Sequence, residues 1–189
     1  KRLKANGVLN HQTEYHLLRL DRRRREIETL VADARRLPLD AGSVDLICSN
    51  NTLEHIPRPV IEDIFREFRR VLEPEGLLLL STPNLRSFRG IRNLLLHNQG
   101  HAVSAGVYQQ YEKLETLGHM GHVREYTTRE VSDFVTRVGF RVGAIIYRGG
   151  HGRGVVGLAE RVAPSMRPFF TLVARRPARG DGEGSRSTC

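Results

Sequence analysis

Three residues with acid–base or hydrogen-bonding side chains follow a strongly apolar stretch of the chain. The stretch 44–48, VDLIC, has the composition of a buried strand and breaks into short polar residues at Ser49 and Asn50. Asn50, Glu54 and His55 would then lie beyond the carboxyl end of this strand, where open α/β sheets bind their ligands. A histidine there can take the proton of a hydroxyl acceptor. The alternative, weighed evenly, is that His55 only orients the start of a helix.

Two further predicted strands end on an acidic residue. The stretch 14–20 is followed by Asp21, and the stretch 27–32 is followed by Asp33. A carboxylate at Asp21 suits the two hydroxyl donors of a ribose, and one at Asp33 suits the exocyclic amine of a purine. If the strand ends lie side by side, these acids and the polar residues after 44–48 predict a nucleoside-containing ligand.

Several histidines gather in the segment 85–126, which shows no sustained strand period. His119 and His122, with His97 or His101, would reach the three ligands of a metal site. No cysteine accompanies them and their spacings are irregular, so we expect structural or solvated roles and no metal site. Tyr126 and His122 precede a predicted helix and are weaker candidates for the same cleft as His55.

The elements that must position these residues follow from the apolar pattern. Pro57 and Pro59 announce a helix whose apolar positions, from Val60 to Leu72, recur at helical spacing. The sequence PEG at 74–76 ends it and leads into 77–81, LLLLS, a strand of the kind that parallel sheets bury on both faces. A right-handed crossover makes the strands 44–48 and 77–81 parallel neighbours.

The rest of the chain completes an α/β order. Thr127 and Glu130 form a capping box that predicts a helix after Thr127, ended by Gly139. Strands are predicted at 140–148 and 169–174, with a glycine-rich connection at 149–157. Residues 1–13 show no clear period and are predicted to be irregular. The predicted domains are a single unit over 1–176 and a disordered tail over 177–189.

The amino-acid composition limits the kinds of partner and the cellular location to be expected. The 189 residues can form one core, and the net charge of +9 comes almost wholly from arginines spread along the chain without interleaved aromatic residues. This spread argues against a nucleic-acid partner. Only two cysteines are present, Cys48 and Cys189, and neither a membrane span nor a secretory signal is visible. We therefore expect a cytoplasmic protein.

The stretch 31–84 resembles the central half of the class I S-adenosylmethionine-dependent methyltransferases, in the type 11 or UbiE/UbiG-like branch. The similar features are Asp33 followed by Ala34, the LPL turn, the VDLI strand, LEHI, the helix exit FRRVLEPEG and STPN. The sequence HVREYTTREVSDFVTRVGF resembles the segment before the family's sixth strand, and FFTLVARRP resembles its closing strand. The resemblance covers roughly residues 14–176.

This resemblance implies a Rossmann-like three-layer α/β sandwich, with a mostly parallel sheet and an antiparallel C-terminal strand. It also implies S-adenosyl-L-methionine as cofactor. By the resemblance, Asp21 binds the ribose hydroxyls, Asp33 and Ala34 the adenine edge, and the stretch 49–53, with Ser49, Asn50 and Leu53, the methionine side. Glu54 and His55 are then the catalytic candidates. The methyl acceptor would be a small-molecule, lipid-like or glycan compound, and 85–126 would form an inserted substrate cap.

One departure from the family pattern leaves two functions open. The family's first strand and glycine-rich loop have no match before Asp21, and residues 1–13 hold one glycine, Gly7. The sequence begins at Lys1 rather than at a methionine, so the domain is expected to be N-terminally incomplete. Either the loop lies upstream of a truncated start or the chain has lost it. The alternative to an enzyme is a non-catalytic methyltransferase-like partner or scaffold domain.

Overall fold

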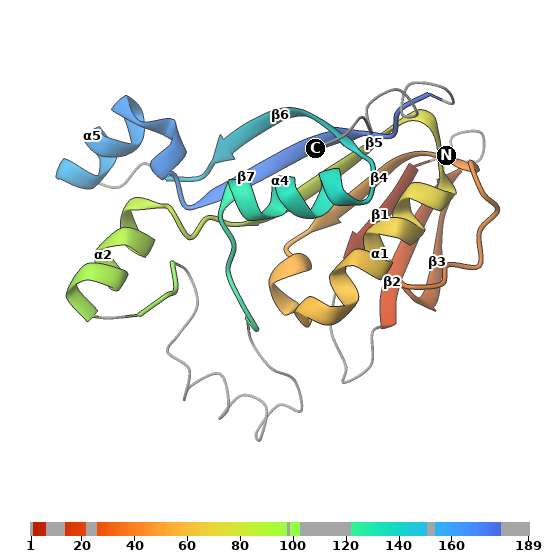
Figure 1. Cartoon of the computed structure of the whole chain (residues 1–189), viewed down its shortest axis with the longest axis horizontal. Coiled ribbons are helices and arrows are strands. Elements are labelled where there is room, and N and C mark those ends of the chain that lie inside the picture. The colour runs from red at the N-terminus through yellow and green to blue at the C-terminus, as the bar shows by residue number, and fades with distance from the viewer. Residues whose placement is uncertain are drawn as a thin grey trace, which may run out of the picture.

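Figure 1 shows the computed structural model of the chain, which describes residues 2–6, 14–21, 26–97, 99–102, 122–150 and 154–178, with side chains from residue 31 onward. The strands are β1 (Arg2–Asn6), β2 (Glu14–Asp21), β3 (Glu26–Asp33), β4 (Val44–Asn50), β5 (Leu72–Pro83), β6 (Arg141–Arg148) and β7 (Phe169–Arg175). The helices are η1 (Leu53–His55), α1 (Arg58–Val71), α2 (Phe88–His97), α4 (Thr128–Arg137), α5 (Gly154–Val162) and η2 (Pro164–Met166).

The strands form one mixed sheet in the order β3-β2-β1-β4-β5-β7-β6. β4 lies parallel to both β1 and β5, and α1 forms the crossover between β4 and β5. The prediction of parallel neighbours at this point is confirmed. β7 is antiparallel to β5 and β6, so the prediction of an antiparallel C-terminal strand is confirmed as well. The chain therefore has a mixed α/β fold.

The N-terminal prediction of an irregular segment is wrong. Arg2–Asn6 forms β1, which lies between β2 and β4 near the middle of the sheet. A strand thus occupies the position that the sequence analysis judged missing or degenerate. Five residues carry too weak a period to predict a strand, and pairing with two neighbours supplies the hydrogen bonds that define this one. The glycine-rich loop would fall at 7–13, outside the described residues.

The direction of β2 departs from a mostly parallel sheet. β2 is antiparallel to both β1 and β3. Its connections to these strands span only residues 7–13 and 22–25. A parallel connection needs a crossover of about a dozen residues or more, whereas antiparallel strands need only a short turn. The lengths of these two connections therefore favour reversal of β2.

The two long central helices are amphipathic and pack on the same face of the sheet (Figure 1). α1 places its apolar residues on the sheet at helical spacing, as predicted, and the buried ones include Ile61, Ile64, Phe65 and Phe68. α4 begins at the predicted capping box, in which Thr127 and Glu130 each bond the other's backbone N–H. Burial of these helix faces against β4, β5 and β7 forms the core.

The opposite face of the sheet is less covered in the part of the chain that the structure describes. Leu78 and Leu80 of β5 face the helices and are buried, whereas Leu77 and Leu79, which alternate with them along the strand, are half-buried. Ile146 of β6 is 51% exposed. The described residues therefore form two layers, and they do not supply the second helical layer of the expected three-layer sandwich.

The elements from β5 onward differ from the prediction in their details. β5 begins at Leu72 rather than at Leu77, and it passes through Glu75 in a left-handed conformation (φ 66°). α5 begins within the glycine-rich connection predicted at 149–157 and extends beyond it to Val162, and its exposed valines and leucine give little periodic signal. None of the described helices combines the length and apolar composition needed to cross a bilayer. The predicted tail lies, from residue 179 on, outside the described residues.

Candidate functional site

A polar rim follows the carboxyl end of β4, as the sequence predicted. The chain leaves the strand at Asn50, whose side chain is exposed, and turns through Asn51 in a left-handed conformation (φ 48°), which asparagine tolerates. The Asn51 N–H donates to the carbonyl of Ser81 on β5 at 2.9 Å. This turn leads directly into η1, which carries Glu54 and His55.

Glu54 points into the protein rather than into solvent. It is fully buried (0% exposed), and its Oε2 accepts a hydrogen bond from Thr82 Oγ1, at the end of β5, at 2.9 Å. Its Oε1 is also buried and has no hydrogen-bond partner. The Glu54 carbonyl accepts from the N–H groups of Val123 and Arg124, at 2.7 and 3.2 Å. These bonds join η1 to a segment about 70 residues further along the chain.

That segment brings a second buried carboxylate to the same place. His122 Nδ1 lies 3.1 Å from Glu125 Oε1, and the other carboxylate oxygen of Glu125 accepts from the N–H of Ala102. Glu125 is buried, and the side chain of His122 is 18% exposed. The imidazoles of His122 and His55 meet edge to face, with centroids 5.0 Å apart. We refer to Glu54, His55, His122 and Glu125 as the Glu–His cluster.

Burial dominates the electrostatics of Glu54. Desolvation raises the pKa of this carboxyl, and the negative charge of Glu125 raises it further. The backbone N–H of Glu54 itself, the hydrogen bond from Thr82 and the proximity of His122 lower the pKa, but together they do not cancel the effect of burial. Because Glu54 is closed off from solvent, it can orient its neighbours but cannot itself meet a free acceptor. His55 and His122, both only partly buried, are the members that a ligand can reach.

The predicted methionine-side residues divide by burial. Asn50 is exposed at the rim, whereas the side chains of Ser49 and Leu53 are buried. Ala34, predicted at the adenine edge, is also part of the buried core. Among these, Asn50 alone presents its side chain to a ligand.

The two predicted acids do not lie together. Asp33 ends β3 opposite Glu14, while Asp21 ends β2 opposite Glu26, because the two strands are antiparallel. Seven residues of strand, or about 23 Å, separate these positions. Asp21 therefore lies at the opposite edge from Asp33 and Asn50, and the expectation of matching strand ends is wrong. The short connection after Asp21 is the cause.

Asp33 lies at the same edge as Asn50, since β3 and β4 run in the same direction. Its carboxylate binds Arg35 in a bidentate pair, with the shortest distance 2.6 Å, and accepts from the Arg35 N–H at 2.9 Å. About a third of the Asp33 side chain remains exposed. β2 and β1 lie between the two strands, which places Asp33 and Asn50 about 14 Å apart across the sheet.

The connection after Asp33 is held in place by α1. Glu67 Oε1 accepts from the Leu37 N–H at 2.6 Å, and Arg70 donates both to Glu67 and to the carbonyl of Leu39. Hydrogen bonds from Arg70 and Leu37 outweigh the effect of burial, which alone would raise the pKa of Glu67, and leave it below its usual value. This network fixes the path of the chain beyond Asp33.

Sequence reasoning missed two members of this site, Thr82 and Glu125. Thr82 belongs to the STPN sequence at the end of β5, the strand next to β4. A hydroxyl residue at this strand end, beside the end of β4, was the sequence signal that could have identified it. Glu125 follows His122 by three residues, a spacing compatible with a local pair. Of the other histidines considered, His97 ends α2, and His101 lies directly before Ala102, whose N–H bonds to Glu125. His119 lies outside the described residues.

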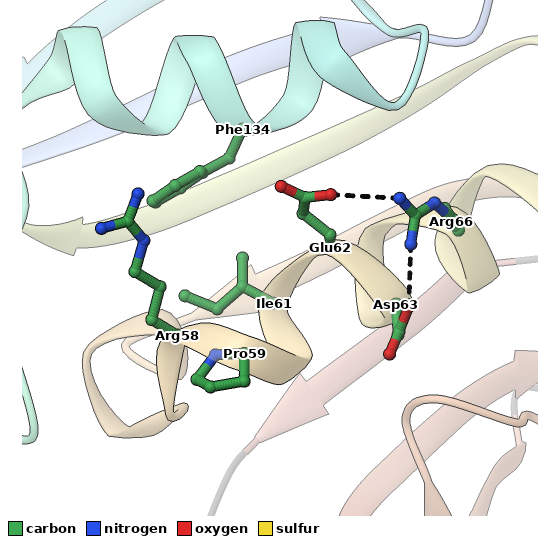
Figure 2. Close-up of a pocket in the computed structure, with 7 residues that line it drawn as sticks. All are labelled: Arg58, Pro59, Ile61, Glu62, Asp63, Arg66 and Phe134. Atoms are coloured by element: carbon green, nitrogen blue, oxygen red, sulfur yellow. Dashed lines mark hydrogen bonds and ion pairs between the residues drawn. The ribbon is translucent and has the colours of Figure 1, made fainter.

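A separate pocket is lined by residues of α1 and α4 (Figure 2). It has a volume of about 440 Å³ and lies between the first turns of α1 and Phe134 of α4. Its charged groups already interact with one another or with Phe134: Arg66 pairs with Glu62 and Asp63, and Arg58 lies over the Phe134 ring. None of its lining residues belongs to the Glu–His cluster.

Residues 7–80 match the sequence model of a family described as a methyltransferase domain. The chain is 35% identical over 90 residues to a malonyl-[acyl-carrier protein] O-methyltransferase of Methylovorus sp. (strain MP688), which covers 48% of this chain and 30% of that protein. It is 41% identical over 78 residues to an uncharacterized methyltransferase of Mycobacterium bovis (strain BCG / Pasteur 1173P2), covering 41% and 30%. The matches thus span about 30% of the length of these relatives.

Two crystal structures share the fold. A protein of Pyrococcus horikoshii OT3 superposes with a TM-score of 0.53 at 18% identity, covering 82% of this chain and 61% of that one. An S-adenosylmethionine-dependent methyltransferase of Methanosarcina mazei gives a TM-score of 0.50 at 14% identity, with 78% and 66% covered. At these identities the likeness concerns the fold alone.

Proposed function

The chain belongs to the class I S-adenosylmethionine-dependent methyltransferases, and from this premise we propose that it transfers a methyl group to an oxygen of a small, lipid-like acceptor. The observation that carries the proposal is the Glu–His cluster. It lies just past the carboxyl ends of the parallel strands β4 and β5, where this type of sheet binds ligands.

Bound S-adenosylmethionine would supply a methyl group carried on a sulfonium sulfur. As an acceptor oxygen forms its bond to the methyl carbon, the sulfur would leave as a neutral thioether. The protein then has two tasks, which are to align the acceptor and to remove the proton of a hydroxyl acceptor. His55 is the proton acceptor in this proposal, because its imidazole is partly exposed at the rim. Glu54 is a positioning residue, since it is buried behind His55 and His122.

The described residues fit the cofactor at two places. Asp33 offers a partly exposed carboxylate at one end of the sheet edge, suited to an exocyclic amine, and Asn50 offers an exposed amide about 14 Å away across the sheet. An extended nucleoside joined to an amino acid needs two such anchors. In this proposal Asp33 binds the adenine end and Asn50 the methionine end.

The apolar surface of α2 and α5 supports a lipid-like acceptor. Three consecutive leucines of α2, Leu94–Leu96, are largely exposed, and so are Val155, Leu158 and Val162 of α5. The two helices contact each other at one end of the molecule (Figure 1). Grouped exposed apolar side chains of this kind mark ligand or partner surfaces. One relative's name, which specifies O-methylation of a malonyl group on a carrier protein, supports an oxygen acceptor with an attached acyl chain. The segment 85–126, which contains α2, would then act as the substrate cap.

A second function remains in competition, because two observations favour it. Asp21 is at the opposite edge from Asp33, and Asp33 is already paired with Arg35. A methyltransferase-like domain that serves as a partner or scaffold needs neither acid for a cofactor. The two functions differ in one measurable property, which is affinity for the cofactor product.

Calorimetric titration with S-adenosylhomocysteine separates them. Heat of binding saturating below millimolar ligand supports the enzyme, and no heat at millimolar ligand overturns it for this chain. Asp33→Ala is expected to weaken binding by about 1 to 3 kcal/mol, the cost of leaving a buried donor unpaired. Asp63→Ala, at an exposed aspartate of α1 paired with Arg66, is the matched control and should leave the affinity unchanged. Equal affinities for both variants would remove Asp33 from the site.

A further inference from the structure

We propose that Glu54, His55 and His122 form a binding site for one divalent transition-metal ion, best suited to Zn²⁺. Each residue offers one ligand atom, and the three atoms lie within 4.8 Å of one another. Tetrahedral ligands at about 2.1 Å from zinc are roughly 3.4 Å apart. The side chains therefore need to approach one another by at most about 1.4 Å to close around an ion, a movement that side-chain torsions can supply.

The unpartnered oxygen of Glu54 is the first observation behind this site. Buried polar atoms in native proteins nearly always have a hydrogen-bond partner. Glu54 Oε2 has one in Thr82, which fixes the carboxylate, whereas Oε1 is buried with none. Carboxylates that bind metals are usually fixed by a hydrogen bond in this way, and the remaining oxygen is left to bind the cation.

The bond between His122 and Glu125 is the second observation. Metal-binding histidines usually donate from one ring nitrogen to a carboxylate, which orients the other nitrogen toward the ion. His122 has this contact, from Nδ1 to Glu125 Oε1 at 3.1 Å, and its Nε2 is left for the metal. Glu125 is itself held by the N–H of Ala102.

Charge and ligand chemistry agree with a dication. Glu54 and Glu125 are both buried and repel each other when ionised, and a divalent ion beside Glu54 offsets that repulsion. Two histidines and one glutamate are the protein ligands of zinc in thermolysin-type sites, which keep one position open for water or substrate. The sequence analysis weighed only the histidines between 97 and 122 and expected no metal site, because their spacings are irregular and no cysteine accompanies them. Glu54 and His55, which the fold brings to His122, are far from it in the chain.

The role of the ion in catalysis rests on the proposed function, whereas its binding does not. A bound Zn²⁺ lowers the pKa of an oxygen ligand, so an acceptor hydroxyl in the open position would lose its proton near neutral pH. In the metal-bound protein His55 is therefore a ligand, and the ion takes over its part in ionising the acceptor.

Metal binding to the purified chain, without cofactor or acceptor, tests the site. The protein is stripped with a chelator and titrated with Zn²⁺ by calorimetry, and Co²⁺ is added in parallel because its visible absorption reports coordination number. We expect one ion per chain and an absorption band of four- or five-coordinate Co²⁺. Glu125→Gln should weaken Zn²⁺ binding by about 10- to 100-fold. Glu54→Gln and His122→Ala should each weaken it at least as much.

His97→Ala is the matched control, since this exposed histidine at the end of α2 lies outside the three ligands. His55→Gln, at a partly exposed position, provides a ligand variant that should fold even if Glu54→Gln does not, and circular dichroism checks both. Binding that is absent, or that Glu54→Gln and His55→Gln leave unchanged, overturns the proposal. A separate titration with S-adenosylhomocysteine keeps the outcomes distinct: cofactor binding without metal binding refutes the metal site alone, and metal binding without cofactor binding refutes the proposed activity alone.

Discussion

Removal of the Glu67 carboxylate should destabilise the protein far more than removal of an exposed carboxylate on the same helix. Glu67 is 9% exposed and accepts the N–H of Leu37, which is itself buried, while binding Arg70 through both oxygens. In Glu67→Ala the Leu37 N–H loses its partner, which costs about 1 to 3 kcal/mol. The pair with Arg70, whose side chain is 40% exposed, adds about 0.2 to 1 kcal/mol. We therefore expect a loss of about 1 to 4 kcal/mol.

Two further variants separate the causes of this loss. Glu67→Gln keeps an oxygen for Leu37 and loses only the charge beside Arg70, so it should cost about 0.5 to 1 kcal/mol. Glu62→Gln removes an exposed carboxylate that pairs with Arg66 four residues later, and it should cost less than about 0.5 kcal/mol.

Urea unfolding followed by circular dichroism measures all three variants. With a slope of about 2 kcal/mol per molar urea, Glu67→Ala should lower the midpoint by roughly 1 M. Equal midpoints for Glu67→Ala and Glu62→Gln would refute the reasoning. If Glu67→Gln proved as damaging as Glu67→Ala, the charge of Glu67 rather than its bond to Leu37 would carry the stabilisation.

Three other predictions follow from single features. The pKa of Glu67 is lower in the folded than in the unfolded chain, so the contribution of its carboxylate to stability is present above about pH 4.3 and is lost as the pH falls through the lowered folded pKa. The stability of Glu67→Gln should therefore fall less steeply on acidification than that of the unmodified protein. Urea midpoints measured from pH 6 to pH 3 will show the difference. Thr127→Ala removes half of the capping box and should cost about 0.5 to 2 kcal/mol in thermal unfolding, whereas Thr128→Ala next to it should cost less. Ile64→Ala, at a fully buried position of α1, should lower stability by about 2 to 5 kcal/mol, and Val60→Ala, only partly buried, by clearly less in the same urea assay.

Local sequence was enough to predict the elements that carry their own signals. The helical spacing from Val60 to Leu72 predicted α1, and the capping box predicted the start of α4, because both signals act within a few residues. The break after 44–48 likewise predicted a polar rim with Asn50 at its edge, and the crossover rule predicted the parallel pairing of β4 and β5. These features depend on local hydrogen bonding and on the handedness of the chain.

The tertiary structure decided what depends on contacts between distant segments. β1 exists because β2 and β4 pair with it, and the direction of β2 separates Asp21 from Asp33 although both acids end strands. The Glu–His cluster unites residues near positions 54 and 122. No spacing along the chain encodes the approach of the ligand atoms of Glu54, His55 and His122 to within 4.8 Å, or the burial that leaves Glu54 with an unpartnered oxygen. The sequence determined which residue types reach the rim, and packing determined which of them meet.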